Sequence, residues 1–364
     1  MTDCIVVGGG IIGMLTARML HERGVDVTLV ERGEVGRESS WAGGGILSPL
    51  YPWRYPEAIT RLARMTQETY PAVAQALLDE TGVDAEWLQS GLLILDQEER
   101  DTAVAWAAVE HQPIQLLKGD GLRAIEPALA PTHTTGLWMP EVAQIRNPRL
   151  LKALHRSLQL RGIAIREHTD VTSIRRENGR AAGVETPAGP ILAERVIVAG
   201  GAWSGPLFPM QGGALPVAPV RGQMILFRAE PGVVQRVTLW RERYVIPRKD
   251  GRVLAGSTLE YVGFEKNATD EAVESLRRAA FEVIPALERF PVEQHWAGLR
   301  PGSPDGIPYI GAHPTIPGLF INAGHFRNGL VMSLASAQLG TELVLGETPC
   351  LDPAPYSPLR FRAG

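Results

Sequence analysis

Three glycines near the N-terminus have the spacing of a dinucleotide-binding turn. Gly8, Gly10 and Gly13 follow the apolar run at 3–7 and open a segment with helical periodicity. In such a GxGxxG turn the first glycine permits a tight bend, the second lets a pyrophosphate approach the backbone, and the third packs the helix against the strand. The free N–H groups and the positive dipole end of the helix would then face the phosphates.

An acidic residue completes this pattern. A second predicted strand, 25–30, ends directly before Glu31, so a whole βαβ unit fits within the first 31 residues. A carboxylate at this place accepts hydrogen bonds from ribose hydroxyls and disfavours the 2′-phosphate of NADP. The sequence therefore predicts dinucleotide binding, with FAD and NAD both open at this point.

Two further glycine-rich segments bear on the choice of cofactor. Residues 36–47, GRESSWAGGGIL, follow the second strand and are suited to wrap a pyrophosphate and the edge of a flavin ring. GHFRNGL at 324–330 places another glycine turn before a helix predicted from Gly329 onward. The N-terminus of that helix would stabilise negative charge on a reduced flavin ring, so both segments favour FAD.

Composition excludes several other classes of protein. The chain has 364 residues, 45% apolar and 21% charged, which is enough for about two globular domains. Its net charge is −4, without the excess of basic residues that nucleic-acid binding requires, so no nucleic-acid partner is expected. Because it has no long apolar run and no basic leader before the first strand, we expect no membrane span or signal peptide and predict a cytoplasmic protein.

Metal binding and the common hydrolytic motifs are not expected either. Cys4 and Cys350 form no CxxC pair and are interpreted as unpaired thiols in a reducing compartment. The eight histidines show no metal-ligand spacing, and HExxH, GxSxG and GKS/T motifs do not occur. Neither thiol is suitably placed to attach a flavin covalently.

The remaining segments alternate between helical and strand patterns. Helices are predicted at 57–80, 98–111, 148–161 and 270–284, and strands at 91–95 and 163–168, with a β-meander at 171–195. From about 216 to 296 the alternating pattern is typical of an antiparallel sheet. The predicted fold class is α/β, a two-domain flavoprotein with a Rossmann-like FAD domain that carries the meander and an antiparallel-sheet substrate domain.

The two predicted domains interleave along the chain, with the active site between them. The FAD domain is assigned residues 1–80, 145–215 and 297–364. The substrate domain is assigned residues 81–144 and 216–296.

Four motifs together resemble one family. GGGIIG at 8–13, RYVIPR at 243–248, WAGLRPGSPDGIPYIG at 296–311 and GHFRNGL at 324–330 resemble the glycine oxidases of the thiamine-biosynthesis type. These belong to the D-amino-acid-oxidase-like family of FAD-dependent oxidoreductases. The resemblance runs from residue 3 to about 346, and the last three motifs in this order are its specific part.

The resemblance implies the site residues. The substrate carboxylate would be held by Tyr244 and Arg300, with Arg327 close by. FAD would be bound non-covalently by Gly8, Gly10, Ile11, Ile12, Gly13, Glu31, Arg32, Ser39, Ser40, Gly44, Gly45, Ile46, Val171, His325, Phe326, Arg327, Asn328, Gly329, Leu330 and Val331.

It also implies an activity. Members of the family are FAD-dependent amine oxidases: they oxidise glycine, sarcosine and small D-amino acids to imines and reduce O2 to hydrogen peroxide. They feed glycine imine into the thiazole of thiamine. The implied partners are a small amino acid and O2, and we expect a homo-oligomer.

The residues themselves are consistent with these roles. Arg300 follows an apolar WAGL and precedes Pro301, so it is predicted to end a strand facing the interior. Its planar guanidinium pairs both oxygens of a carboxylate and stays charged when buried. Tyr244 alternates with Ile246 on one face of a strand. His325 is assigned a backbone or flavin-edge role, because hydride transfer from a neutral amine needs no protein base.

Some positions depart from the family pattern and leave the preferred amine open. The flavin loop is WAGGGIL where relatives often have an alanine-rich run, Leu259 stands where some relatives have Met, and Glu242 where one branch has His. The alternative function is a D-amino-acid or sarcosine dehydrogenase that uses an acceptor other than O2. A flavin module for tRNA modification is disfavoured, because the chain has no basic stripe.

Overall fold

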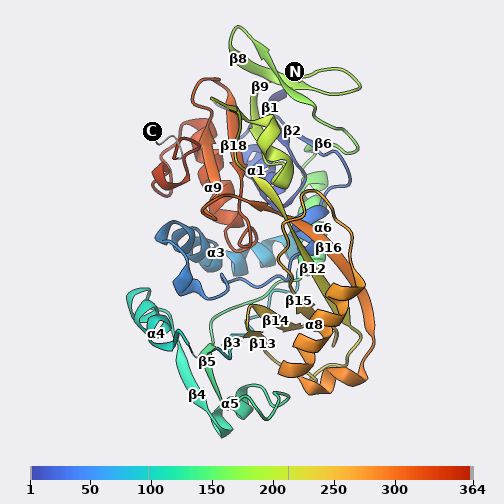
Figure 1. The fold of residues 1–364 in the computed structure, drawn as a ribbon. Helices are drawn as coiled ribbons and strands as arrows, with labels where there is room; N and C mark the ends of the chain where they lie inside the picture. The colour runs from blue at the N-terminus through green and yellow to red at the C-terminus, as the bar shows by residue number, and fades with distance from the viewer. Residues whose placement is uncertain (1, 97, 212, 361–364) are drawn as a thin grey trace.

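Two eight-stranded sheets form the two ends of an elongated molecule, with the long helix α3 between them (Figure 1). The structure is a computed structural model that describes residues 2–96, 98–211 and 213–360.

The first sheet has the strand order β17-β18-β9-β1-β2-β6. Its inner strands are parallel, and the β7–β8 hairpin joins the edge of β9 as the predicted meander. Short apolar runs form these strands because both faces of a parallel sheet are buried. The bounds are β1 (Thr2–Val7), β2 (Val27–Val30), β6 (Ala164–Arg166), β7 (Ser173–Glu177), β8 (Arg180–Glu185), β9 (Ile191–Val198), β17 (Tyr309–Ala312) and β18 (Leu319–Ala323).

Helices cover this sheet and close its core. Buried side chains such as Leu15, Leu154 and Leu334 pack together with strand residues Val6 and Leu29. The covering helices are α1 (Ile11–Glu22), α3 (Glu57–Thr81), α6 (Asn147–Leu160) and α9 (Ser333–Leu345).

The second sheet has the order β16-β12-β15-β14-β13-β3-β5-β4 and is antiparallel except for the parallel pair β13–β3. Helix α8 (Asp270–Val283) and the 3-10 turn η3 (Pro285–Arg289) cover one face of it (Figure 1). The strands are β3 (Leu92–Ile94), β4 (Gln115–Lys118), β5 (Thr135–Met139), β12 (Ala218–Phe227), β13 (Val237–Trp240), β14 (Arg243–Pro247), β15 (Val253–Gly256) and β16 (Val292–Gly302).

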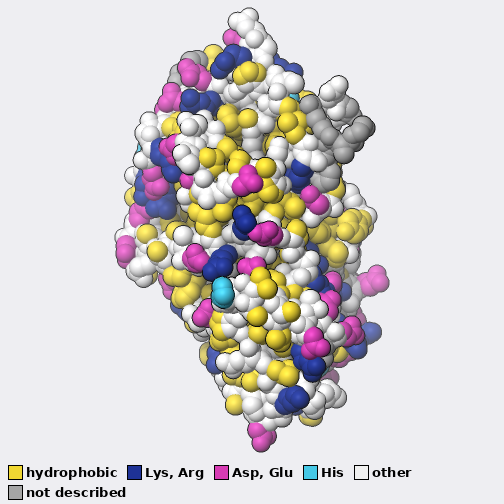
Figure 2. All heavy atoms as spheres, turned by 90° about the vertical axis from the view of Figure 1, so that its left-hand side faces the viewer, with side chains coloured by type: hydrophobic (Ala, Val, Ile, Leu, Met, Phe, Trp, Pro, Cys, Tyr) yellow, Lys and Arg dark blue, Asp and Glu magenta, His cyan; other side chains and the backbone are white. Residues whose placement is uncertain are grey.

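Shorter elements lie between the strands of both sheets and near the C-terminus. They are α2 (Glu38–Ala42), η1 (Pro52–Arg54), α4 (Arg100–Val109), α5 (Asp120–Ile125), η2 (Gly201–Trp203), α7 (Ser204–Leu207), β10 (Pro209–Met210), β11 (Gly213–Ala214) and η4 (Ala354–Tyr356). Acidic and basic side chains lie mixed over the face drawn in Figure 2, with hydrophobic side chains gathered between them. Among the described helices, none is both long and apolar enough to span a bilayer.

The predicted fold class is confirmed, and the predicted elements agree with the structure within a few residues. One prediction is wrong: the last helix does not begin at Gly329 but at Ser333. Successive turns occupy the segment before it, where Phe326 has a positive φ of 46° and the N–H of Asn328 bonds back to His325. Strand β16 runs without a break through the predicted domain boundary at 296–297, because it pairs with β12 along its whole length.

Candidate active site

A cavity of about 530 Å³ extends from the β1–α1 turn to the second sheet. It is lined by the ends of β1, β2 and β9, by residues 37–50, by Tyr244 on β14, Arg300 on β16 and by the turns after β18. Every residue that the sequence predicts for FAD or substrate lies on its wall except Gly13. Segments far apart in the chain therefore meet in one space.

The glycines of the first turn differ in what they do. Gly8 has a φ of 113°, and a Cβ there would lie 2.4 Å from the carbonyl oxygen of Ala199, which directly follows the neighbouring strand β9. A Cβ on Gly13 would lie 1.8 Å from the carbonyl oxygen of Gly8, so this glycine lets α1 pack directly under the turn. Gly13 thus shapes the turn from behind the cavity wall.

Glu31 ties the turn together. Its Oε2 accepts the N–H of Gly9 at 2.7 Å, and its Oε1 accepts the N–H of Gly33 at 2.8 Å. Glu31 also lines the cavity, where its predicted role is to bind ribose. Its two hydrogen bonds have a second effect, which is to fix the backbone of the glycine turn. This second role was not predicted from the sequence.

Two side chains near Glu31 complete this end of the cavity. The hydroxyl of Ser40 accepts the N–H of Ile11 at 3.0 Å and so satisfies a donor in the first turn of α1. The guanidinium of Arg32 lies 3.5 Å from the ring centroid of Trp203, a close cation–π contact. Trp203 also lines the cavity.

The glycine loop, residues 43–46, separates this end from the second sheet. A Cβ on Gly44 would lie 3.0 Å from Ile246 and 3.1 Å from Tyr244, so the loop lies tightly against β14. Gly45 has a φ of 81°, and a Cβ there would lie 2.0 Å from the carbonyl oxygen of Ile145. The alternation of Tyr244 and Ile246 on one strand face is as predicted, and that face meets the loop.

Arg300 is held at the far end of the cavity by three acceptors. It donates to the hydroxyl of Ser257 at 2.8 Å and to the carbonyls of Thr258 at 3.1 Å and Arg221 at 3.3 Å. Burial lowers the pKa of Arg300, and the neighbouring Tyr244 opposes that shift. With an ordinary arginine pKa above 12, the guanidinium remains a cation that is fixed in place before a substrate binds.

Arg327 also reaches the cavity but is held more loosely. Its guanidinium lies 3.7 Å from the carboxylate of Glu242, which is about half exposed. Arg54 approaches the same carboxylate at 3.5 Å. The structure therefore brings Tyr244, Arg300 and Arg327 to one cavity, with Arg300 the most firmly positioned of the three.

His325 lies buried beside the cavity. Its Nε2 has no hydrogen-bond partner among the described residues, and burial alone lowers its pKa to about 3. The imidazole is therefore neutral at physiological pH and a weak base. This agrees with the sequence-based reasoning that did not assign a base to it.

Comparison with known proteins decides the family. A model of the DAO family, described as FAD dependent oxidoreductase, matches residues 3–343. The protein belongs to this FAD-dependent oxidoreductase family. The resemblance stated from the motifs is confirmed, and FAD rather than NAD is the cofactor of this flavoprotein.

Individual relatives match nearly the whole of this chain. A glycine oxidase of Pseudomonas aeruginosa is 50% identical over 355 residues, which are 97% of this chain and 98% of that protein. The crystal structure of glycine oxidase from Geobacillus kaustophilus has a TM-score of 0.93 at 30% identity, covering 100% of this chain and 99% of that one. A bifunctional protein ThiO/ThiG of Nostoc is 29% identical over 94% of this chain and 52% of that protein.

The flavoprotein's own residues fit the cofactor. Three buried polar atoms without a protein partner belong to residues on the cavity wall: Oδ1 of Asn147, Oδ1 of Asn322 and Nε2 of His325. Buried polar groups are almost always paired, so such atoms indicate a polar ligand. The glycine turn at the N-terminus of α1 adds free N–H donors for a pyrophosphate.

Sequence reasoning missed two residues of the substrate end. Ser257 follows β15 and lines the cavity, where it binds Arg300. Arg243 donates to the carbonyl of Ser257 from the neighbouring strand. Ser257 lies outside the four motifs, and Arg243 opens RYVIPR without a predicted role of its own; the pairing of β14 with β15 brings the two residues together.

Proposed function

We propose that the protein catalyses the FAD-dependent oxidative deamination of glycine and of small amines such as sarcosine and small D-amino acids. The observation that carries this proposal is the fixed guanidinium of Arg300, which lines the same cavity as the buried Tyr244 and the glycine loop. A cation held ready by neutral acceptors suits the carboxylate of an amino acid. The similarity to proteins named glycine oxidase supports the choice of substrate.

The reaction is a two-electron oxidation. When bound, FAD accepts the two electrons and the hydrogen that leave the α-carbon of the substrate. The amine becomes an imine, which water hydrolyses to a 2-oxo acid and ammonia, or methylamine when the substrate is sarcosine. The two electrons removed from the substrate, together with two protons, then convert O2 to hydrogen peroxide. The reaction therefore needs no further reductant.

The chain's residues bind and orient the substrate. Arg300 would pair with both carboxylate oxygens, the hydroxyl of Tyr244 would donate to one of them, and Arg327 would add a second cation. No side chain is needed to remove a proton in this scheme, because the amine can enter in its neutral form. The neutral, buried His325 is in keeping with that assignment.

We further propose that the imine supplies the thiazole of thiamine and that the protein acts in the cytoplasm as a homo-oligomer. The similarity to the bifunctional protein ThiO/ThiG supports the first part. Two free thiols, Cys4 and Cys350, support a reducing compartment. Light scattering on the purified protein tests the oligomer, since a monomeric mass would contradict it.

The decisive test is an oxygen-electrode and peroxide assay on the purified yellow protein with glycine, sarcosine, D-alanine and D-proline. We expect O2 consumption and peroxide formation in equal amounts with glycine or sarcosine. If the amines reduce the flavin without O2 consumption, and only an artificial dye restores turnover, the protein is a dehydrogenase. If none of the four amines reduces the flavin, the proposed substrate class is wrong.

A further inference from the structure

Arg248 stands just beyond the end of β14, in line with Tyr244 and Ile246. It is largely buried, and burial lowers the pKa of its guanidinium to about 10. No carboxylate among the described residues forms an ion pair with it. Burying a cation without an ion pair costs free energy, so its hydrogen bonds must offset that cost.

All three of its hydrogen bonds go to neutral acceptors on two segments. Nη2 donates to the carbonyl of Gly44 at 2.7 Å. Nη1 donates to Oε1 of Gln144 at 2.9 Å and to the carbonyl of Ile145 at 3.3 Å. Gln144 is itself buried and donates to the hydroxyl of Ser90. Arg248 therefore fastens the glycine loop to the strand that carries Tyr244.

These bonds fix the direction of the loop's peptide groups. The carbonyl of Gly44 faces Arg248, and the carbonyl of Gly45 accepts the N–H of Ile145 at 2.8 Å. In a trans peptide the C=O and the following N–H point in opposite directions, so the N–H groups of Gly45 and Ile46 are turned away from these partners. Both residues line the cavity, and neither N–H has an acceptor in the described part of the chain.

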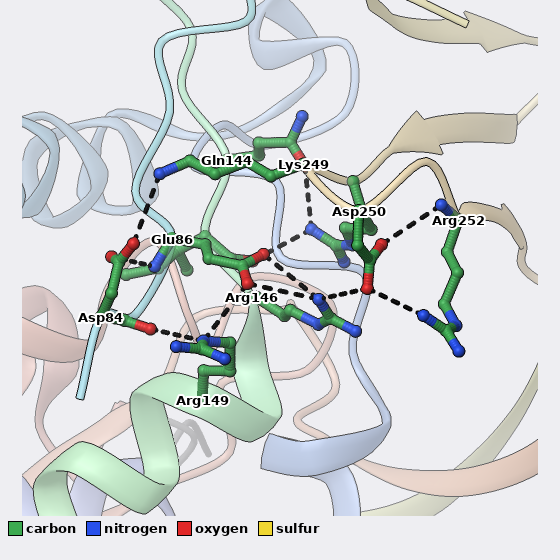
Figure 3. Close-up of polar contacts among 10 residues, drawn as sticks. Asp84, Glu86, Gln144, Arg146, Arg149, Lys249, Asp250 and Arg252 are labelled. Atoms are coloured by element: carbon green, nitrogen blue, oxygen red, sulfur yellow. Dashed lines mark hydrogen bonds and ion pairs between the residues drawn. The ribbon is translucent and has the colours of Figure 1, made fainter. Parts of the chain in front are cut away.

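Charged residues of the β14–β15 turn and of the segment before α6 form a network of ion pairs (Figure 3). Arg146, at the start of α6, binds the carboxylate of Asp250 at 2.9 Å and that of Glu86 at 3.3 Å. Glu86 and Asp250 raise the pKa of Arg248, while Arg146 lowers it. The guanidinium of Arg252, in the same turn as Arg248, binds the same oxygen of Asp250, Oδ2, at 3.0 Å. The network holds the β14–β15 turn against the segment that precedes α6.

We infer that Arg248 is a positioning residue for the cofactor. It fixes the carbonyl of Gly44, thereby directs the N–H groups of Gly45 and Ile46 toward the edge of the flavin ring, and places a buried positive charge behind them. Both effects stabilise the negative charge that the ring carries after two-electron reduction. The inference rests on the proposed placement of FAD and deepens the proposed function.

The test compares Arg248→Met and Arg248→Lys with a matched control, Arg252→Met. The control removes the same charge from the same turn, but Arg252 binds Asp250 and Glu293 and does not contact the glycine loop. The measurements on each FAD-loaded protein are the two-electron midpoint potential, the visible spectrum, the dissociation constant of FAD and the rate of flavin reduction against glycine concentration.

We expect Arg248→Met to weaken binding of the reduced cofactor about tenfold relative to the oxidised one, which lowers the midpoint potential by about 30 mV. The limiting rate of reduction should fall while KM for glycine changes little, because Arg300 is untouched. Arg248→Lys keeps the charge and one donor, so its potential should lie between wild type and Arg248→Met. The control should match wild type in potential and spectrum.

Two results would overturn the inference: a wild-type potential and spectrum in Arg248→Met, or an equal shift in Arg252→Met. If Arg248→Met does not fold, Arg248→Lys decides, since wild-type values in every measurement would remove the positioning role. The potentials are measured with a chemical reductant. They therefore test Arg248 even if the wild-type protein oxidises none of the amines, which would count against the proposed function alone.

Discussion

The guanidinium of Arg300 occupies the space that a side chain on Gly222 would fill. A Cβ added to Gly222 would lie 2.1 Å from Nη1 of Arg300 and 2.3 Å from its Cζ. The two residues stand on neighbouring strands, β12 and β16, whose pairing places Gly222 opposite Gly298 and Val220 opposite Arg300. The absence of a side chain on β12 is therefore what allows the cation to lie where the substrate carboxylate is proposed to bind.

Gly222→Ala should displace Arg300 while leaving the fold intact. The added methyl group would meet the end of the flexible Arg300 side chain, which can move, and not a backbone atom. We expect kcat/KM for glycine to fall about 10–150-fold, the equivalent of one charge-assisted hydrogen bond of about 1.5–3 kcal/mol. Steady-state kinetics and thermal unfolding measure the two effects. Gly121→Ala is the control, because it adds the same methyl group into open space on the distant helix α5. Unchanged kinetics in Gly222→Ala would show that Arg300 does not need this space.

Arg300→Lys tests the carboxylate pairing itself. A single ammonium cannot reproduce the planar fork of a guanidinium, nor its bonds to Ser257 and Thr258. We expect a loss of about 2–4 kcal/mol in kcat/KM, or roughly 30–1000-fold, with unchanged flavin content. Kinetics with glycine and absorbance at the flavin band give both values. An Arg300→Lys enzyme as active as wild type would remove this residue from the substrate site.

The features that could be predicted from the sequence are local in the chain. The βαβ unit is one, since its strand, glycine turn, helix and acidic end lie within 31 consecutive residues. The roles of the residues that sequence reasoning missed depend on contacts between distant segments. Gly222 lies against Arg300, Ser257 accepts a hydrogen bond from Arg300, and Arg248 donates one to the glycine loop. Gly222 lies within β12, while Ser257 and Arg248 directly follow β15 and β14. Their roles become visible only when strand pairing in the second sheet sets their neighbours.

Glu31→Gln should weaken FAD binding for two reasons. The amide loses the negative charge that accepts ribose hydroxyl protons, and one of the two carboxylate oxygens that hold Gly9 and Gly33 becomes an NH2 group. We expect the dissociation constant of FAD to rise, while the turnover of fully loaded enzyme changes little. Titration of the apoprotein with FAD measures the first quantity, and kinetics at saturating FAD the second. A large loss of turnover in loaded Glu31→Gln would assign Glu31 a role beyond holding the cofactor.

Burial of His325 makes the stability of the fold depend on pH. Its pKa is lowered to about 3 in the folded protein, while the unfolded chain binds a proton near its ordinary value of about 6.5. The unfolded state is therefore favoured as pH falls below about 6.5, by up to about 1.4 kcal/mol per pH unit. Denaturant unfolding at pH 7.5 and 5.5 measures this loss, which should be smaller in His325→Asn. An equal pH dependence in both proteins would contradict a neutral His325.

The proposed mechanism uses no side chain as a general base. The substrate must lose its ammonium proton before hydrogen leaves the α-carbon, so flavin reduction at low substrate should speed up with pH and follow the deprotonation of the substrate amine. Stopped-flow reduction across pH measures this in wild type, His325→Ala and Tyr244→Phe.

Both variants should keep the pH profile, for different reasons. A His325 with a pKa of about 3 is too weak a base to assist near neutral pH. Tyr244→Phe removes one hydrogen bond to the carboxylate, worth about 0.5–3 kcal/mol, and should raise KM more than it lowers the limiting rate. If the rise in rate with pH disappears in one variant only, the base-free mechanism is wrong and that residue is the base.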